Sequence, residues 1–484
     1  MAARSETLRF AGGSLWLSPA VAALGGGLLA FGAGFVLAAA AWRLGADSSP
    51  LILVAIPLLP LIAVGVVTAP LLGAIVVFAT FPVGSIQIPT GFIELQTAEL
   101  AVLAMVTVVA VRRLALGQLP LPWQPPLYWA LALLVWAVID LHSAIDNTLA
   151  LKQIGSTFGG IIFAACILAA CRNMNDLRIL LGAFLAVTAG IAATSFSGGV
   201  RLHADFGAEA VEGRLHGAFD HPNQLGALCA IGVSVAIGLV FGARRRWARV
   251  AAGAACMVVF LALLFTLSRG AWIGTALALL YLLVALSEVR RAAMVMILPG
   301  IVVIALLAAF VPAGSSEIKV VGERARALTA LSPYDNRREI YAEAWREIRA
   351  NPLTGVGPGG FPVASRRAGS QTSTYEVVHA HNLLLTWGAE AGIPAVLFII
   401  GLVVSLGFAA HEASRVFRRL GRLRDRAITA GIAAGLLAIL GQGAFDFVLR
   451  NAVANIATWA MIGALLVCQR EAQRAAAMDR RESS

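Results

Sequence analysis

The stretch HAHNLLLTWGAEAGIPAVLFIIGLVVSLGFAA, residues 379–410, passes within four residues from a polar segment into a long apolar run. A bilayer span takes about 20 such residues, so this run is long enough to cross a membrane as a helix. Two histidines stand where the chain enters the run. Because an imidazole titrates near neutrality, a histidine at this surface can accept a proton from a hydroxyl group.

The polar segment before this run covers residues 313–380 and differs from almost everything that precedes it. Its basic residues are Lys319, Arg324, Arg326, Arg337, Arg338, Arg346, Arg349, Arg366 and Arg367. In a chain that is otherwise largely apolar, a polar loop of this size is the expected place for chemistry at the membrane surface.

The composition extends this interpretation to the whole chain. Of its 484 residues, 59% are hydrophobic and 13% are charged, and the mean hydropathy is +0.83. The apolar runs are long and continuous, which is typical of membrane helices and not of barrel strands. We therefore predict an all-α integral membrane protein with about 12–14 transmembrane helices and one large periplasmic loop that contains an amphipathic helix.

The predicted spans cover residues 17–42, 51–67, 69–83, 98–111, 126–142, 153–171, 177–197, 223–242, 249–267, 270–288, 293–312, 393–412, 427–447 and 452–468. The predicted parts of the chain are N-terminal transmembrane helices (1–312), the large loop (313–380), C-terminal transmembrane helices (381–470) and a cytoplasmic tail (471–484).

Clusters of arginine orient these spans. If the spans alternate in direction, the clusters at residues 244–249, 290–291 and 415–426 fall on one side, which the positive-inside rule makes cytoplasmic. Both termini then face the cytoplasm, and the large loop faces the outside. Arg214 and Arg269 fall on the outer side, where this rule does not favour them, and their presence there calls for an anionic partner.

Residue spacing excludes several kinds of site. Lys152 and Lys319 are the only lysines, and neither follows a glycine-rich run, so the chain has no phosphate-binding loop of an ATPase. The five cysteines lie inside apolar runs, without the spacing of a disulfide framework or a metal site. His379 and His381 have no third and fourth ligand at a suitable spacing, so we expect no metal and no cofactor.

Within the large loop, Asn336–Ala350 reads as an amphipathic helix along the membrane surface, with Asn336 as its cap and Glu339 completing a capping box. Its predicted apolar face consists of Ile340, Tyr341, Ala344, Trp345 and Ile348. The glycine-rich segment that follows, residues 355–361, is expected to be a flexible turn, with an anion-binding nest as the alternative.

Two arginines lie at or shortly before the predicted starts of membrane helices. Arg214 shortly precedes His221-Pro222-Asn223, where an apolar run begins, and a guanidinium there can bind phosphate through two parallel hydrogen bonds. The alternative is an interfacial arginine that extends its side chain to water. Arg269 lies between two apolar runs with almost no loop, and ionisable groups so placed usually line a cavity.

One histidine acting as a general base is the preferred interpretation of the His379/His381 pair, and His381 is favoured because it abuts the helix. The alternative is a histidine bonded to the backbone at a helix start. Further candidates for substrate binding are Arg337, His379, Asn382 and His221. Weaker polar groups near helix ends are Asp140, His142, Asp146, Lys152, Asp446 and Arg450.

Taken in order, these residues resemble the O-antigen ligase and O-antigen polymerase superfamily of bacterial envelope glycan assembly. The resemblance spans roughly residues 200–400 and has four carriers: Arg214 ahead of His221-Pro222-Asn223, Leu267-Ser268-Arg269-Gly270, the stretch from Arg337 through Asn351-Pro352-Leu353-Thr354-Gly355-Val356-Gly357, and His381-Asn382 followed by Gly392. Ala395 stands where the ligase pattern has Gly, Thr or Tyr, which ranks polymerase before ligase.

The resemblance implies a multi-pass protein of the bacterial inner membrane, surrounded by membrane lipids, whose donor is a glycan on undecaprenyl diphosphate at the periplasmic face. The acceptor would be a saccharide or lipid A-core, and no nucleic acid is involved. Arg214 and Arg269 would bind the diphosphate, and His381 would activate the acceptor hydroxyl.

We therefore expect a metal-independent glycosyltransferase, foremost a polymerase of O-antigen or exopolysaccharide. The first alternative is an O-antigen ligase that transfers the glycan to lipid A-core. A transporter ranks lower, because transporters carry charges near the membrane midplane and this chain concentrates them at one surface.

Overall fold

The computed structural model describes residues 70–84, 86–89, 94–115, 117, 122–198, 214–293, 337–367 and 379–483. These residues are mostly helical, apart from an antiparallel hairpin of two short strands in which Gln87 pairs with Gln96. The elements are α3 (Pro70–Ala79), η1 (Phe81–Val83), β1 (Gln87–Pro89), β2 (Glu94–Gln96), α4 (Thr97–Ala115), α5 (Pro125–Ile139), η2 (Asp140–Ser143), α6 (Asn147–Ala170), α7 (Met174–Ser195), η3 (Phe196–Gly198), α8 (Pro222–Gly242), α9 (Arg246–Phe265), α10 (Arg269–Ala285), α13 (Arg337–Ala350), α14 (Phe361–Arg367), α15 (Leu383–Arg419), α16 (Leu423–Gly443), η4 (Val448–Arg450) and α17 (Ala452–Glu482).

Seven helices of the described part of the chain are long and apolar enough to cross a membrane, and an eighth span results if α10 is joined to the bent segment after it. The prediction of an all-α integral membrane protein is thereby confirmed. Three of the predicted 12–14 spans, at residues 17–42, 51–67 and 293–312, lie outside the described residues. Of the predicted span at 69–83, the structure describes residues 70–83, which form the ten-residue helix α3 followed by a 3-10 turn.

Glycines bring the central helices α8, α16 and α10 into close contact. A Cβ atom added to Gly238 of α8 would lie 3.0 Å from the Cα atom of Gly431 of α16. A Cβ added to Gly274 of α10 would lie only 2.2 Å from the carbonyl oxygen of Ala438. Small residues of this kind let membrane helices pack backbone to backbone, so these three helices form a tightly packed support for whatever lies at their ends.

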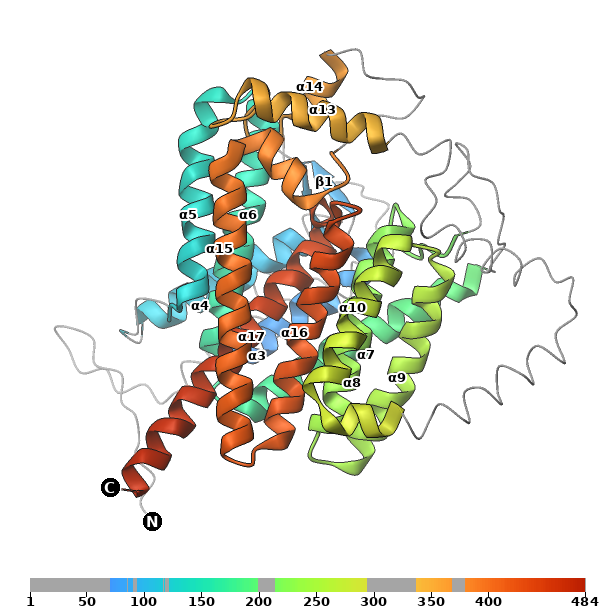
Figure 1. Cartoon of the computed structure of the whole chain (residues 1–484), viewed down its shortest axis with the longest axis vertical. Coiled ribbons are helices and arrows are strands. Elements are labelled where there is room, and N and C mark those ends of the chain that lie inside the picture. The colour runs from blue at the N-terminus through green and yellow to red at the C-terminus, as the bar shows by residue number, and fades with distance from the viewer. Residues whose placement is uncertain are drawn as a thin grey trace, which may run out of the picture.

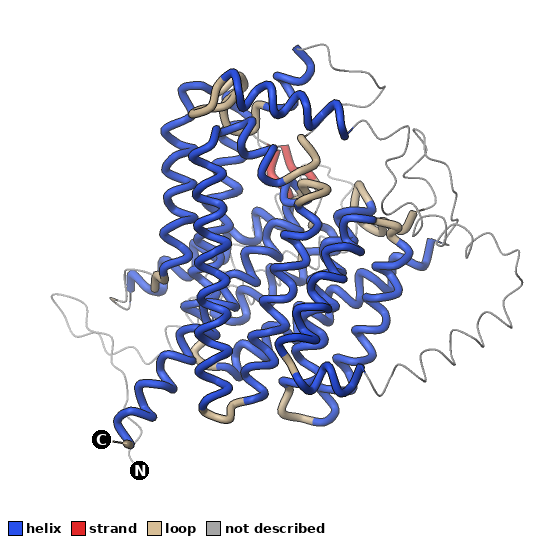
Figure 2. Tube along the Cα trace, viewed as in Figure 1, coloured by secondary structure: helices blue, strands red, loops and turns tan. Residues whose placement is uncertain are grey.

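The helices alternate in direction, so the turns between them gather at two ends of the bundle (Figures 1 and 2). One end carries α13 and α14, together with the starts of α8, α10 and α15, and we call it the α13 end (Figure 1). The opposite end carries the arginine-rich turns between α8 and α9 and between α15 and α16. This arrangement agrees with the predicted alternation of the spans.

Helix α13 lies across the α13 end, as an amphipathic helix should, and packs against α15 (Figure 1). Ala344 and Ile348 are buried in this contact, as predicted. Trp345, on the predicted apolar face, is not buried by the protein: its side chain is 48% exposed, and the guanidinium of Arg349 lies over its ring at 5.3 Å. Glu343 takes its place on the buried face and forms an ion pair with Arg346. The predicted cap, Asn336, lies outside the described residues.

Helix α15 begins ten residues earlier than the predicted span and is broken at Ala391–Gly392, where Gly392 has φ +74°. The glycine-rich segment before it is not the predicted flexible turn. Residues 355–360 are buried, and the backbone N–H of Val356 donates to the carbonyl of Ala389 at 2.9 Å. Glycine is needed here because a Cβ at Gly355 would lie 2.3 Å from that same carbonyl oxygen. Residues 355–361 thus pack against the first half of α15, and we call them the glycine-rich clasp.

Candidate functional site

A cavity of about 110 Å³ opens at the α13 end of the bundle. Its walls are polar and strongly basic. They consist of Arg214, His221, Asn223, Ser268, Arg269, Gly270, Arg337, His381, Phe445 and Asp446. These residues come from segments that are far apart in the sequence. The packing of α8, α10 and α16, with α15 against α16 and α13 against α15, brings them together.

Three helices begin at this cavity: α8, α10 and α15. All three are capped by side chains, with His221 before α8, Ser268 before α10 and Asn382 before α15. The start of a helix carries unpaired N–H groups and the positive end of the helix dipole. Their convergence adds to the charge of the three lining arginines, so the cavity is suited to an anion such as a phosphate.

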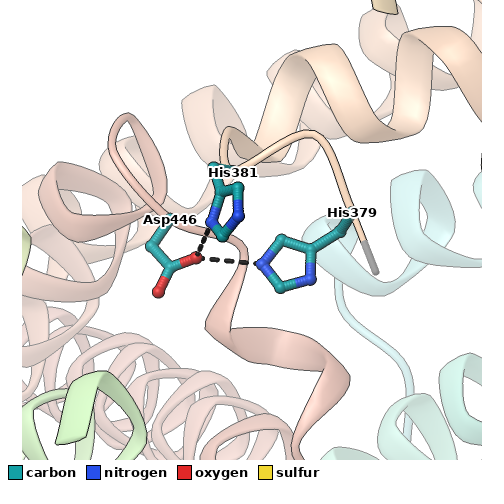
Figure 3. Close-up of side chains that lie close together, drawn as sticks. All are labelled: His379, His381 and Asp446. Atoms are coloured by element: carbon teal, nitrogen blue, oxygen red, sulfur yellow. Dashed lines mark hydrogen bonds and ion pairs between the residues drawn. The ribbon is translucent and has the colours of Figure 1, made fainter. Parts of the chain in front are cut away.

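The carboxylate of Asp446 lies at the wall of the cavity, in the turn between α16 and η4 (Figure 3). One of its oxygens, Oδ1, lies 2.9 Å from His379 Nε2 and 2.9 Å from His381 Nδ1. An ionised carboxylate only accepts hydrogen bonds, so both imidazoles donate an N–H to it. The lone pair of His381 is consequently on Nε2, the nitrogen that does not contact Asp446.

The other oxygen of Asp446 connects the histidines to Arg214. Asn223 Nδ2 donates to Asp446 Oδ2 at 2.6 Å, and Arg214 Nη2 donates to Asn223 Oδ1 at 3.1 Å. Arg214 Nε also donates to the carbonyl of Thr266 at 2.9 Å. We call Arg214, Asn223, Asp446, His379 and His381 the Asp446 cluster. In this cluster the buried amide of Asn223 links the guanidinium of Arg214 to the carboxylate that holds both imidazoles, and so fixes their relative positions.

The charges of the cluster follow from burial and hydrogen bonding. Burial raises the pKa of Asp446, but the hydrogen bonds from His379 and His381 more than offset this and hold its pKa well below the usual value. Burial lowers the pKa of His379, with the hydrogen bond to Asp446 opposing it. The cluster therefore contains an ionised carboxylate that two imidazole N–H groups support.

The backbone is held in unusual conformations on both sides of the cavity. His381 has φ +49° and Leu267, directly before Ser268, has φ +50°. Tyr341 of α13 donates from its hydroxyl to the carbonyl of His381 at 3.1 Å, which ties the base candidate to the helix above it. Non-glycine residues in the left-handed region persist only where the surroundings determine them, and they cluster at functional sites.

Five of the residues that the sequence singled out line this one cavity, namely Arg214, His221, Arg269, Arg337 and His381. His379 and Asn382 do not line it. His379 lies behind, against Phe447 and the ring of His381. The carboxamide of Asn382 caps α15 and donates to the carbonyl of Ala444 at 3.0 Å, so it positions the turn that carries Asp446.

Two important residues were missed or underrated by sequence reasoning. Asn223 was noted only as part of a helix start, and Asp446 only as weak polar lining. Both lie at helix ends next to apolar runs, but nothing in their sequence positions indicates a contact across 223 residues. Asp446 is also a possible third metal ligand beside His379 and His381, which the spacing in the sequence did not reveal. One ligand atom of each of these three residues lies within 4.8 Å of the other two.

A second buried carboxylate lies on α15, at Glu390, immediately before the break in that helix. It accepts a hydrogen bond from Gln153 Nε2 at 2.9 Å and lies 3.7 Å from Arg450 Nη2. The backbone N–H groups of Gly359 and Phe361 also interact with it. We call these five residues the Glu390 cluster. None of them lines the cavity, and the glycine-rich clasp thus provides its amides to an internal carboxylate.

Comparison with known families adds an independent result. Residues 254–400 match a family model described as O-antigen ligase. The matched range includes Arg269, α13 and His381, and it confirms the resemblance to the O-antigen ligase and polymerase superfamily. It also supports membrane glycosyl transfer of this type as the function. No curated protein matched the chain.

Proposed function

We propose that the cavity at the α13 end transfers a glycan from undecaprenyl diphosphate to a sugar hydroxyl, and that the protein is a polysaccharide polymerase. One observation carries the proposal. An imidazole whose Nδ1–H is held by a buried carboxylate stands at a cavity whose other charged lining residues are arginines. This arrangement combines a base with a site for a phosphorylated leaving group.

Arg214 and Arg269 are assigned to the diphosphate of the donor, together with the starts of α8 and α10. The bond between the anomeric carbon and the diphosphate oxygen breaks with its electron pair on oxygen. Negative charge therefore grows on the diphosphate, and fixed cations placed there lower the barrier. Because the diphosphate leaves as a stable anion, the reaction needs no general acid.

We assign to His381 the role of general base for the acceptor hydroxyl. The hydroxyl oxygen attacks the anomeric carbon, and its proton passes to His381 Nε2. Asp446 orients the ring through Nδ1 and stabilises the imidazolium that forms, as a carboxylate does for the histidine of a catalytic triad. Asn223 holds the carboxylate, so the base and the diphosphate site keep a fixed separation. This scheme uses neither ATP nor a metal, because the donor bond supplies the free energy.

The choice of polymerase over ligase rests on Ala395, which departs from the ligase pattern. The description of the matched family as O-antigen ligase favours the second candidate, a transfer of finished glycan to lipid A-core. Purified protein incubated with a lipid-linked repeat unit distinguishes them. A polymerase yields a ladder of longer lipid-linked chains without any other acceptor, whereas a ligase yields product only when lipid A-core is added. No transfer with either acceptor would refute the proposal.

The proposed location is the bacterial inner membrane, with the cavity at the periplasmic face and both termini in the cytoplasm. The arginine-rich turns at the opposite end of the bundle support this orientation. A cysteine introduced within residues 337–367 should react with an impermeant thiol reagent in intact spheroplasts. A cysteine next to Arg246 or Arg419 should react only after lysis. The reverse pattern would place the cavity in the cytoplasm.

A further inference from the structure

We propose that His379, His381 and Asp446 form a binding site for a divalent transition-metal ion such as Zn²⁺, and that the bound ion switches the base off. Two imidazole nitrogens and a carboxylate oxygen are a typical donor set for zinc. The binding half of this inference does not depend on the proposed function, whereas the inhibition rests on it.

The three ligand groups face one another, and an ion between them requires the side chains to adjust. The three ligand atoms lie within 4.8 Å of one another, and both imidazole nitrogens are 2.9 Å from the same carboxylate oxygen. With bonds of about 2.0–2.1 Å, neighbouring ligands of a tetrahedral zinc ion are roughly 3.3 Å apart. Small rotations of the two rings away from Asp446 Oδ1 open the space that the ion needs.

The surroundings supply what a three-ligand site requires. The cavity reaches His381 and Asp446, so it offers a route for the ion and room for water as the fourth ligand. Asn223 keeps its bond to the other oxygen of Asp446, and hydrogen-bonded ligand carboxylates are typical of metal sites. Arg214, Arg269 and Arg337 line the same cavity and repel a cation. We therefore expect reversible binding, not a permanently held ion.

Binding inactivates His381 through its proton. In the metal-free protein the N–H is on Nδ1 and points at Asp446, and Nε2 carries the lone pair. An ion that binds at Nδ1 needs the lone pair of that nitrogen. The proton of the neutral ring must therefore move from Nδ1 to Nε2. The side of the ring that would meet the acceptor hydroxyl then holds a proton and cannot accept another. Inhibition follows even where the donor still binds.

The test uses the full-length protein in detergent, freed of metal by dialysis. Equilibrium dialysis against Zn²⁺ should show one bound ion per chain, and Co²⁺ should give the intense visible absorption of a tetrahedral site. Binding should strengthen as pH rises, because the imidazoles must be unprotonated. His379→Ala and Asp446→Asn should each lose at least ~10-fold in affinity. His411→Ala, at an exposed position on α15, is the control and should bind as the wild type does.

Thermal unfolding in metal-free buffer shows whether each variant is folded. If one variant is not, the comparison rests on the other. No stoichiometric binding by the wild type, or undiminished binding by the folded variants, would overturn the proposed site.

Glycan transfer separates the two proposals. We expect ZnCl₂ to inhibit transfer and EDTA to restore it, with EDTA alone causing no loss. Loss of transfer in EDTA alone would refute the metal-independent mechanism, although the binding site would stand. Undisturbed transfer in protein shown to hold the ion would refute the inhibition.

Discussion

The Asp446 cluster and the Glu390 cluster each contain a buried carboxylate and an arginine, but they differ in the other partners of the carboxylate and in its access to the cavity. Asp446 is bonded to two titratable rings and lies at a cavity. Glu390 is bonded to an amide side chain and meets a guanidinium and backbone N–H groups, away from that cavity. Burial of a charge is therefore not itself a sign of chemistry. The partners of the charge and its access to a cavity decide its role.

The comparison predicts that changes at the cavity lower the rate and leave the fold intact. The largest effect is expected for Arg214→Ala and Arg269→Ala, which should each reduce glycan transfer by at least ~10²-fold, because each removes a cation where charge develops. Lysine should restore only part of the rate, since it lacks the planar fork. Transfer assays on protein matched for membrane accumulation measure this. Full activity of both alanine variants would contradict the diphosphate assignment.

His381→Ala should lose about 10²-fold in rate, the usual contribution of a positioned base, with His379→Ala milder. Donor binding should survive in the His381 variant, because the arginines hold the diphosphate. Direct binding of lipid-linked donor, measured beside the transfer rate, separates the two effects. Normal transfer by His381→Ala would show that another group is the base.

At the Glu390 cluster the opposite pattern is expected. Glu390→Ala should destabilise the protein by about 3 kcal/mol, because it removes the buried carboxylate that Gln153 and Arg450 contact. Glu390→Gln keeps the volume and should cost less. Thermal unfolding in detergent measures the loss, and transfer per folded molecule should stay near the wild-type value. A rate loss in fully stable protein would erase the distinction between the clusters.

The break in α15 gives a smaller effect of the same kind. Gly392→Ala should cost about 2 kcal/mol of stability, because φ is +74° and the new Cβ would lie 2.0 Å from the carbonyl oxygen of Leu353. Gly407→Ala is the matched control on the same helix, where a Cβ meets nothing within 4 Å. It should be neutral or slightly stabilising. Equal losses in both variants would show that the break is not a packed feature.

Acid should weaken the fold through His221 at the cavity. Burial lowers the pKa of His221 from 6.5 to about 4, so between these values the unfolded chain binds a proton that the folded protein does not. Stability is therefore complete above pH 6.5 and falls as pH decreases, by about 1 kcal/mol for the first unit. Asparagine keeps the helix cap without titrating, so His221→Asn should flatten the pH dependence of the melting temperature. An unchanged slope would contradict this origin.

The sequence predicted the parts of the molecule whose pattern is local. The spans at 223–242 and 249–267 correspond to α8 and α9 within a few residues, and Arg214, Arg269 and His381 were chosen from their positions at helix ends. The predicted span for α15 began too late, because residues 383–392 include the buried carboxyl group of Glu390 and the break at Ala391–Gly392. A charged residue and a glycine in one short stretch look like the end of an apolar run when the sequence is considered alone.

The Asp446 cluster could not be predicted from local sequence patterns, because its residues are far apart in the sequence. Asp446 and His379 are 67 residues apart, and Asn223 and Asp446 are 223 apart. The packing of α16 against α8 and against α15 brings them together. Each side chain on its own looked like an ordinary polar residue at a membrane interface. The proposed chemistry depends on contacts between these side chains, and those contacts form only in the folded bundle.

The late position of Asp446 also bears on how the protein is made. A ribosome delivers Arg214 and Asn223 to the membrane long before α16 and the turn that follows it. Until that turn arrives, the two histidines have no carboxylate and Asn223 has no partner at its Nδ2 atom. A nascent or prematurely ended chain thus contains most of the arginines but no assembled base. On the proposed mechanism, no glycan transfer is expected before the turn that carries Asp446 has been synthesised and has docked against α8.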